Sequence, residues 1–273
     1  MTGSSICAYD AVKFPITEMP GQRATAEQLS MFYTRYHFAR SWCQGRGVLE
    51  IACGGCQGLR YLAEVCPRAV GLDIDREALV AARTLEPTRQ LALSCGDGHA
   101  LPFVSGSFEA VLLLDAIYWL REPVQFLAEV SRVLAPGGIV LITSVNPDWA
   151  EFNPSPYATH YFNAEALLEM LRGAGFATQL YGVYKAVPST RAARLVARIR
   201  RAAVAARLIP TSIRGKEILK RLFYGQLTPL PTRVYDGMAP YEVPVPFTPG
   251  TRVCYKLLYA VGRRQSACGA TVI

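Results

Sequence analysis

Residues 48–58, with the sequence VLEIACGGCQG, constrain the fold more than any other stretch of the chain. The first four are apolar apart from Glu50, as expected of a short buried parallel strand. The small residues that follow suit a tight turn, and a helix is predicted over 58–65. In an open α/β sheet, a strand, a turn and a helix in this order bring free backbone N–H groups to the carboxyl edge of the sheet, where ligands bind. The stretch therefore predicts a ligand site.

The alternation of strand and helix continues along the chain to about residue 176. Two of the later predicted strands end in an acidic residue or lead into one. A proline–glycine stop precedes the fifth predicted strand. The stretches concerned are 70–73 (VGLD), 95–103 (CGDGHALPF), 107–111 (SFEAV) and 132–138 (RVLAPGG). In this order the motifs resemble those of the class I S-adenosylmethionine-dependent methyltransferases, and the resemblance covers residues 48–176.

The resemblance implies an α/β fold with a doubly wound, Rossmann-like, seven-stranded and mostly parallel sheet. The last strand is expected to be antiparallel and to lie between the fifth and the sixth. Strands are predicted at 47–52, 68–73, 90–94, 108–114, 138–145, 176–184 and 252–261. Helices are predicted from a capping box at Thr25 to about Trp42, and then at 58–65, 76–84, 124–134 and 164–172.

Residues 185–250 separate the last two predicted strands and are too many for a structureless loop in a compact domain. We expect three parts: a core at 1–188 whose N-terminal segment forms a lid, a basic helical cap insertion at 189–250, and a final strand and tail at 251–273. Residues 189–221 hold ten Lys and Arg and a single Glu, in a chain of net charge +8. This basic segment is either a solvated surface or a site for an anionic group.

The resemblance implies S-adenosylmethionine as the cofactor and assigns its contacts by position. Glu50 is expected near the methionine amino group, Asp73 at the ribose hydroxyls and Asp97 at the adenine amino group. The other expected contacts are Ala52, Gly54 and Gly58 in the turn, Ile74 on the adenine face, Gly98 at the ring edge, and Asp115 at the methionyl group.

Two residues of the turn depart from the family pattern, because Ala52 and Cys56 stand where glycine is more common. A cysteine at the third glycine position is expected to place its side chain near the methionyl group. Cys53 and Cys56 also form a C-x-x-C pair, yet no second pair or histidine cluster completes a zinc site. We therefore expect no metal and regard the eight cysteines as reduced thiols.

Methyl transfer from a sulfonium requires an acceptor atom held in line with the S–CH₃ bond and away from water. A hydroxyl acceptor benefits from a base, whereas an amine near its pKa needs only positioning. The candidates for a catalytic role are His37, His160, Asp115 and Tyr118. The aromatic segment 146–162 and Trp119 are expected either to line the acceptor pocket or to pack a cap onto the sheet. Tyr9 and Arg23 are further candidates in the lid.

These observations predict methyl transfer to a hydroxyl or amine of a small molecule, such as a sugar or natural product. One alternative is an enzyme of the same fold that binds the cofactor without transferring methyl, as some pericyclases and cyclases do. The other is a nucleic-acid methyltransferase, which is disfavoured because the basic segment lacks interleaved aromatic residues. An anionic acceptor and a homodimer are left open.

The chain has no run of 18 uncharged apolar residues, so no membrane span is expected. Its first residues lack the basic start and the apolar core of a signal peptide. A cytoplasmic location is the corresponding expectation.

Overall fold

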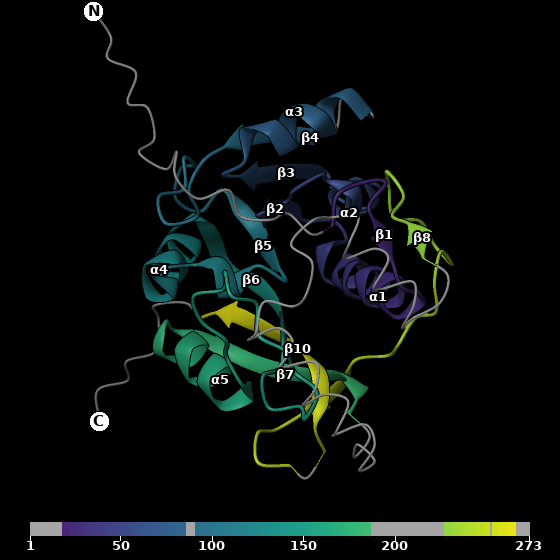
Figure 1. Cartoon of the computed structure of the whole chain (residues 1–273). Helices are drawn as coiled ribbons and strands as arrows, with labels where there is room; N and C mark the ends of the chain where they lie inside the picture. The colour runs from purple at the N-terminus through teal and green to yellow at the C-terminus, as the bar shows by residue number, and fades with distance from the viewer. Residues whose placement is uncertain (1–17, 86–90, 187–226, 252, 266–273) are drawn as a thin grey trace, which may run out of the picture.

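The computed structural model describes residues 18–85, 91–186, 227–251 and 253–265. These residues form one large sheet with helices on both faces and a small two-stranded sheet at one side (Figure 1). The helices are α1 (Ala26–Cys43), α2 (Gln57–Leu62), α3 (Arg76–Leu85), α4 (Pro123–Val133), α5 (Ala164–Gly173) and the 3-10 turn η1 (Ile117–Trp119). The strands are β1 (Arg23–Ala24), β2 (Gly47–Ile51), β3 (Arg68–Asp73), β4 (Leu91–Cys95), β5 (Phe108–Leu114), β6 (Leu134–Val145), β7 (Phe176–Lys185), β8 (Thr228–Pro229), β9 (Val245–Phe247) and β10 (Tyr255–Arg264).

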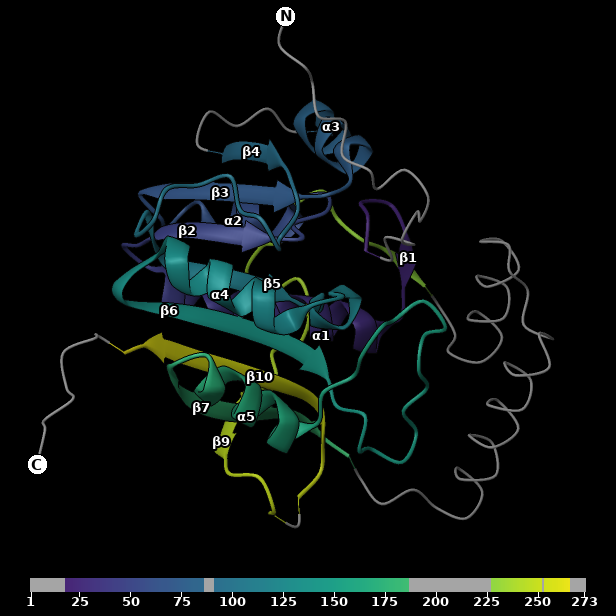
Figure 2. The same ribbon diagram turned by 90° about the vertical axis from the view of Figure 1, so that its left-hand side faces the viewer.

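The large sheet has the strand order β4-β3-β2-β5-β6-β10-β7-β9. The first five strands are parallel, whereas β10 pairs antiparallel with both β6 and β7. In Figure 2 the arrow of β10 accordingly points opposite to those of β2, β3 and β6. The predicted antiparallel last strand, placed between the fifth and sixth core strands, is confirmed.

The described residues form eight strands in this sheet, not the seven that the sequence predicts. The additional strand is β9, which pairs antiparallel with the edge of β7 and places Phe247 opposite Leu180. It has only three residues, one of them a proline, so it carries no strand pattern that a sequence reading would detect. Proline is tolerated here because an edge strand needs few of its N–H groups for pairing.

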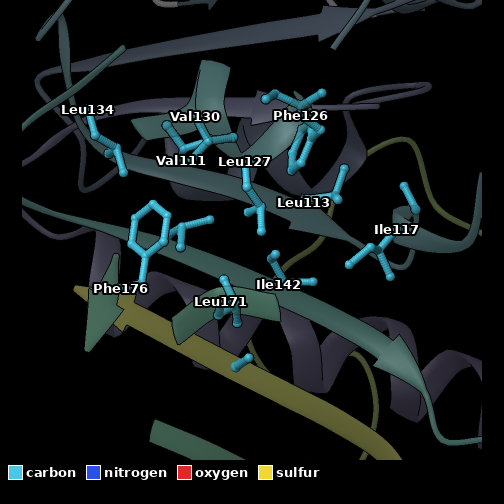
Figure 3. Packing of buried hydrophobic residues seen from close by; sticks show 14 of the residues in the cluster. Val111, Leu113, Ile117, Phe126, Leu127, Val130, Leu134, Ile142, Leu171 and Phe176 are labelled. Carbon is cyan, nitrogen blue, oxygen red and sulfur yellow. The ribbon is translucent and has the colours of Figure 1, made fainter. Parts of the chain in front are cut away.

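The two faces of the sheet bury different apolar clusters. On one face, side chains of β5 and β6 pack against α4 and α5, and Figure 3 shows Val111, Leu113 and Ile142 beside Phe126 and Leu171. On the other face, α1 and α2 cover the same strands. Both faces of β2 are therefore buried, which explains its continuous burial from Gly47 to Ile51.

The helix starts follow the local sequence signals. Thr25 and Gln28 form the predicted capping box at the start of α1, with Oγ1 of Thr25 accepting from the N–H of Gln28 at 3.1 Å. Asn163 caps α5 in the same way. Asp75 accepts the N–H groups of Glu77 and Ala78 at the start of α3.

The segment 227–250, part of the expected cap insertion, contains no helix. It begins with β8, which pairs with β1, and then runs through bends and turns along α1 and α2. Leu230 and Val234 are buried in the apolar cluster beneath α1, and the N–H of Val234 donates to the carbonyl of Gln57 at 3.1 Å. The helical, basic part of the expected cap, at 189–221, lies outside the described residues and stays a prediction.

None of the helices in the described ranges combines the length and apolarity that a membrane span needs.

Candidate functional site

A cavity of about 230 Å³ opens at the carboxyl ends of the parallel strands β2, β3, β4 and β5. Seven of the predicted cofactor residues line it, and their contacts with a cofactor stay a prediction. They are Ala52, Gly54, Asp73, Ile74, Asp97, Gly98 and Asp115. Glu50 and Gly58 are not among the lining residues. We call this space the edge cavity.

The turn between β2 and α2 is unusual in its backbone. Ala52 and Cys56 adopt φ values of 57° and 58°, in the left-handed region that glycine occupies more easily. Non-glycine residues pay about 1–2 kcal/mol for this conformation. The turn thus keeps the shape that glycine would give it at both departures from the family pattern.

The side chain of Cys56 was expected near the methionyl group, but it does not line the edge cavity. Its side chain is fully buried, with Sγ 3.6 Å from Sγ of Cys53, in a cluster with Leu59 and Leu79. The left-handed backbone of Cys56 turns the side chain toward α2 and α3. Both thiols are free, and Cys53 is the member of the pair that lines the cavity.

Asp73, at the end of β3, organises the neighbouring backbone. Its Oδ2 accepts from the N–H of Gly54 at 2.7 Å, and its Oδ1 accepts from the N–H of Asp75 at 2.8 Å. Burial raises the pKa of Asp73, and the two N–H donors act against this shift. Each carboxylate oxygen retains a second lone pair, so Asp73 can accept further hydrogen bonds from a ligand in the cavity.

Glu50 lies behind the cavity wall. Its Oε1 accepts from the hydroxyl of Tyr36 at 2.7 Å, and Tyr36 is the residue that faces the cavity. Oε2 has no hydrogen-bond partner among the described residues. Burial raises the pKa of Glu50 to about 8, with the Tyr36 hydrogen bond opposing the shift. A buried carboxyl oxygen without a partner next to the cavity is what a bound polar group would satisfy.

Gly58 has a packing role in this structure. A Cβ at this position would lie 1.9 Å from Cε1 of Tyr36, inside the tyrosine ring. The glycine therefore lets Tyr36 lie over α2 and reach Glu50. The predicted approach of a cofactor to the backbone of Gly58 has no support in this arrangement.

Asp97 and His99 form a rigid turn after β4. Oδ1 of Asp97 accepts from the N–H of His99 at 2.9 Å and contacts Nδ1 of its ring at 2.7 Å. Nε2 of His99 accepts from the N–H of Glu122 at 3.3 Å. Both residues line the cavity. The histidine thus fixes the orientation of Asp97 and leaves Oδ2 of the carboxylate for a ligand.

Asp115, at the end of β5, contacts a residue that the sequence reading missed. Its carboxylate accepts a short hydrogen bond from Arg35, which lies on α1 with only 3% of its side chain exposed. The other end of the Arg35 guanidinium donates to Oε1 of Glu18 at 2.6 Å. One guanidinium therefore joins two carboxylates that both line the cavity. Burial raises the pKa of Glu18, and Asp115 adds to the shift while Arg35 opposes it.

The segment before α1 contributes one residue to the cavity, and its expected role as a lid stays a prediction. Glu18 lines the cavity, and its carbonyl accepts from Nε2 of Gln57 at 3.0 Å. Arg23, by contrast, is outside the cavity and donates to the carbonyl of Leu227. Tyr9 lies outside the described residues. A signal for Arg35 was present, since a lone charge stands among the aromatic residues of α1, but nothing in the sequence indicated Glu18.

The two histidine candidates lie away from the edge cavity. Nδ1 of His37 is 3.1 Å from the hydroxyls of Tyr33 and Tyr61, and its ring packs against Tyr241. His160 is exposed and packs beside Phe162. Neither residue lines the cavity, so the predicted base role of both has no support in the structure.

Tyr118 and Trp119, which follow β5, line the cavity close to Asp115. The ring of Tyr118 stacks on Tyr161, which in turn contacts Phe152 edge-on. Burial raises the pKa of Tyr118 well above its usual range, and Asp115 adds to the shift. The aromatic segment 146–162 thus supports the cavity wall from behind through Tyr161.

Comparison with known proteins identifies the domain. Residues 49–142 match the family described as "Methyltransferase domain". This part of the chain is a class I S-adenosylmethionine-dependent methyltransferase domain. Its fold matches a possible histamine N-methyltransferase from Thermotoga maritima, with a TM-score of 0.55 at 14% identity over 88% of this chain and 92% of that one. A [4+2]-cyclase matches with a TM-score of 0.55 at 20% identity over 92% and 87%.

Curated relatives match half of this chain or less. A probable S-adenosylmethionine-dependent methyltransferase of Mycolicibacterium smegmatis is 34% identical over 49% of this chain and 53% of its own length. A fatty-acid O-methyltransferase of the same organism is 35% identical over 40% of each chain. The chain thus spans about half the length of these relatives, or less.

The residues around the edge cavity of the methyltransferase domain suit the cofactor of this family, S-adenosylmethionine. The cofactor carries a sulfonium, an ammonium and several hydroxyl and amine donors, and the cavity offers four carboxylates, Glu18, Asp73, Asp97 and Asp115. The orphaned Oε2 of Glu50 adds a buried acceptor beside it. The donor set and the charge therefore both fit.

Proposed function

We propose that this chain transfers a methyl group from S-adenosylmethionine to a hydroxyl or amine of a small molecule. The observation that carries the proposal is the meeting of Asp73, Asp97 and Asp115 in one cavity, at the ends of three parallel strands of a methyltransferase domain. When bound, the cofactor supplies a methyl group that its sulfonium has already activated.

In this proposal the two ends of the cavity have different tasks. Asp73 accepts the ribose hydroxyls, Ile74 packs on the adenine, and Oδ2 of Asp97 accepts from the adenine amino group. These residues follow β3 and β4, on one side of β2. Asp115 and Tyr118 follow β5, on the other side, and the acceptor is placed there. We call these the nucleoside end and the acceptor end.

The acceptor end is built to keep water out. Phe32, Tyr36, Tyr118 and Trp119 line it with aromatic rings, and the Tyr161 stack holds Tyr118 in place. Exclusion of water strengthens electrostatic contacts and prevents competing hydrolysis. Rigid walls also hold an acceptor in the in-line geometry that displacement requires.

The test has two parts. Isothermal titration should show binding of S-adenosylmethionine and S-adenosylhomocysteine at one site per chain, with no competition by NAD. Incubation with methyl-labelled cofactor and an extract of the host should then yield a labelled small molecule, identified by its mass. Binding of NAD, without binding of S-adenosylmethionine or S-adenosylhomocysteine, would refute the assignment of S-adenosylmethionine as the cofactor. Cofactor binding without any labelled product would favour an enzyme that does not transfer methyl, as the fold shared with the [4+2]-cyclase allows.

A further inference from the structure

Among the described residues, the edge cavity is lined by more acidic than basic side chains. Four carboxylates face it, and the guanidinium groups near it among the described residues are Arg121, in the lining, and the buried Arg35. If these groups carry their usual charges, the cavity has an excess of two negative charges. S-adenosylmethionine has a sulfonium, an ammonium and a carboxylate, so it offsets one of them. One negative charge then remains in the cavity as a whole.

The strand order divides the carboxylates between the two ends of the cavity. Asp73 and Asp97 lie at the nucleoside end, where their partners are the neutral hydroxyl and amino groups of the cofactor. Glu18 and Asp115 lie at the acceptor end and share the one guanidinium of Arg35. The acceptor end therefore presents two carboxylates with one guanidinium between them.

Glu18 is the more accessible of these two carboxylates. Its side chain is 40% exposed, compared with 22% for Asp115, and Arg35 occupies only its Oε1. Asp115 is held on both oxygens, by Arg35 and by the hydroxyl of Thr143 at 3.3 Å. Oε2 of Glu18 is therefore the acidic oxygen best placed to contact an acceptor.

The neighbours of Glu18 suit a cation. Phe32, Tyr36, Tyr118 and Trp119 line the same cavity, and aromatic faces attract ammonium groups, most strongly where water is excluded. A carboxylate among aromatic rings binds a protonated amine well, whereas an acceptor carboxylate or phosphate would meet two like charges.

We propose that the acceptor is a primary or secondary amine, bound as its ammonium by Glu18 and deprotonated by that carboxylate. This inference rests on the proposed methyl transfer. One N–H proton of the ammonium passes to Oε2 of Glu18, which leaves a lone pair on nitrogen. The nitrogen forms a bond to the methyl carbon while the C–S bond breaks, and its electron pair stays on sulfur. The positive charge of the sulfonium ends on the methylated amine.

Partial desolvation in the cavity wall raises the pKa of Glu18, with Arg35 opposing the shift, and a raised pKa makes its carboxylate a stronger base. Arg35 acts as a positioning residue, because its guanidinium lies between Glu18 and Asp115 and donates to both. The anionic acceptor considered from the basic segment finds no such support in the described lining of the cavity.

The binding test uses three probes of similar size on protein saturated with S-adenosylhomocysteine: phenethylamine, 2-phenylethanol and 3-phenylpropionate. Titration should show that the amine binds at least tenfold more tightly than the acid. Glu18→Gln should reduce this preference to less than about threefold. The matched control Glu165→Gln, on the exposed first turn of α5, should leave the preference unchanged.

Several results would overturn the amine while leaving the methyltransferase intact. The proposal of an amine fails if the acid binds as tightly as the amine. It also fails if the preference for the amine survives Glu18→Gln. If Glu18→Gln weakens S-adenosylhomocysteine itself more than tenfold, Glu18 serves the cofactor and the inference is wrong. If no probe binds, the labelled product from the host extract decides: a product retained on a cation exchanger at pH 5 supports the amine, and a neutral or acidic product refutes it. Failure of the wild-type protein to bind S-adenosylhomocysteine would instead refute the proposed function.

Discussion

Replacing Glu50 with glutamine should change how the stability of the cofactor-free protein depends on pH. Glu50 is 1% exposed, and burial raises its pKa from 4.5 to about 8. The folded state therefore holds a proton that the unfolded state releases at lower pH. The stability contribution of this proton is complete below about pH 4.5 and is lost as the pH rises to about 8, after which it levels off.

The size of the effect follows from the two pKa values. Each unit of difference corresponds to about 1.36 kcal/mol, so the wild-type protein should lose about 4 kcal/mol between pH 5 and pH 9 through this group. Glutamine has nearly the same shape, accepts the hydroxyl of Tyr36 and does not titrate. All other groups titrate in both proteins, so their contributions cancel in the difference.

Urea unfolding of the wild-type protein and of Glu50→Gln, at several pH values between 5 and 9, measures this difference directly. The variant should gain stability relative to the wild type by about 4 kcal/mol over that range. A difference that stays constant to within about 1 kcal/mol would show that Glu50 is hydrated or paired in the folded protein, and the reasoning from burial would fail.

Two further predictions concern the nucleoside end and the packing behind it. Asp73→Ala should weaken S-adenosylhomocysteine binding by about tenfold or more and also lower the melting temperature, because the carboxylate holds the backbone of the turn as well. Asp148→Ala, outside the cavity, is the control, and equal dissociation constants for the two variants would contradict the assignment. Gly58→Ala should cost about 1–3 kcal/mol in urea unfolding because its Cβ overlaps Tyr36. Gly173→Ala, at the end of α5 with open space around it, should cost nothing, and equal stabilities would refute the packing argument.

Much of the fold could be predicted from the sequence because the core strands are continuous apolar runs with clear stops. The strand 68–73 is exact, and 90–94 is displaced by one residue from the observed Leu91–Cys95. The predicted start of the fifth core strand at 138 was late. It begins at Leu134, where the register with β5 shifts across the Pro-Gly-Gly stretch. A stop signal for a helix and an irregular strand look alike in a single sequence.

The cavity was predictable where its residues follow strands directly, as Asp73 and Asp97 do. It was not predictable where a residue reaches it from elsewhere in the chain. Glu18 belongs to an irregular segment whose path no periodicity indicates. His37 and Tyr36 are adjacent on α1, yet successive helical residues point about 100° apart, so Tyr36 faces the cavity while His37 faces Tyr61 and Tyr241.

The position of β10 has a consequence for how the chain is synthesised. Residues 255–264 fill the space between β6 and β7, so until they leave the ribosome those two strands have no partner for their facing edges. The parallel half of the sheet, with the nucleoside end, is complete in sequence by Val145 and can assemble earlier. Open apolar strand edges promote aggregation, and pairing across such a distance in sequence is slow. We therefore expect chains that stall shortly before residue 255 to be the form of this protein that most needs a chaperone.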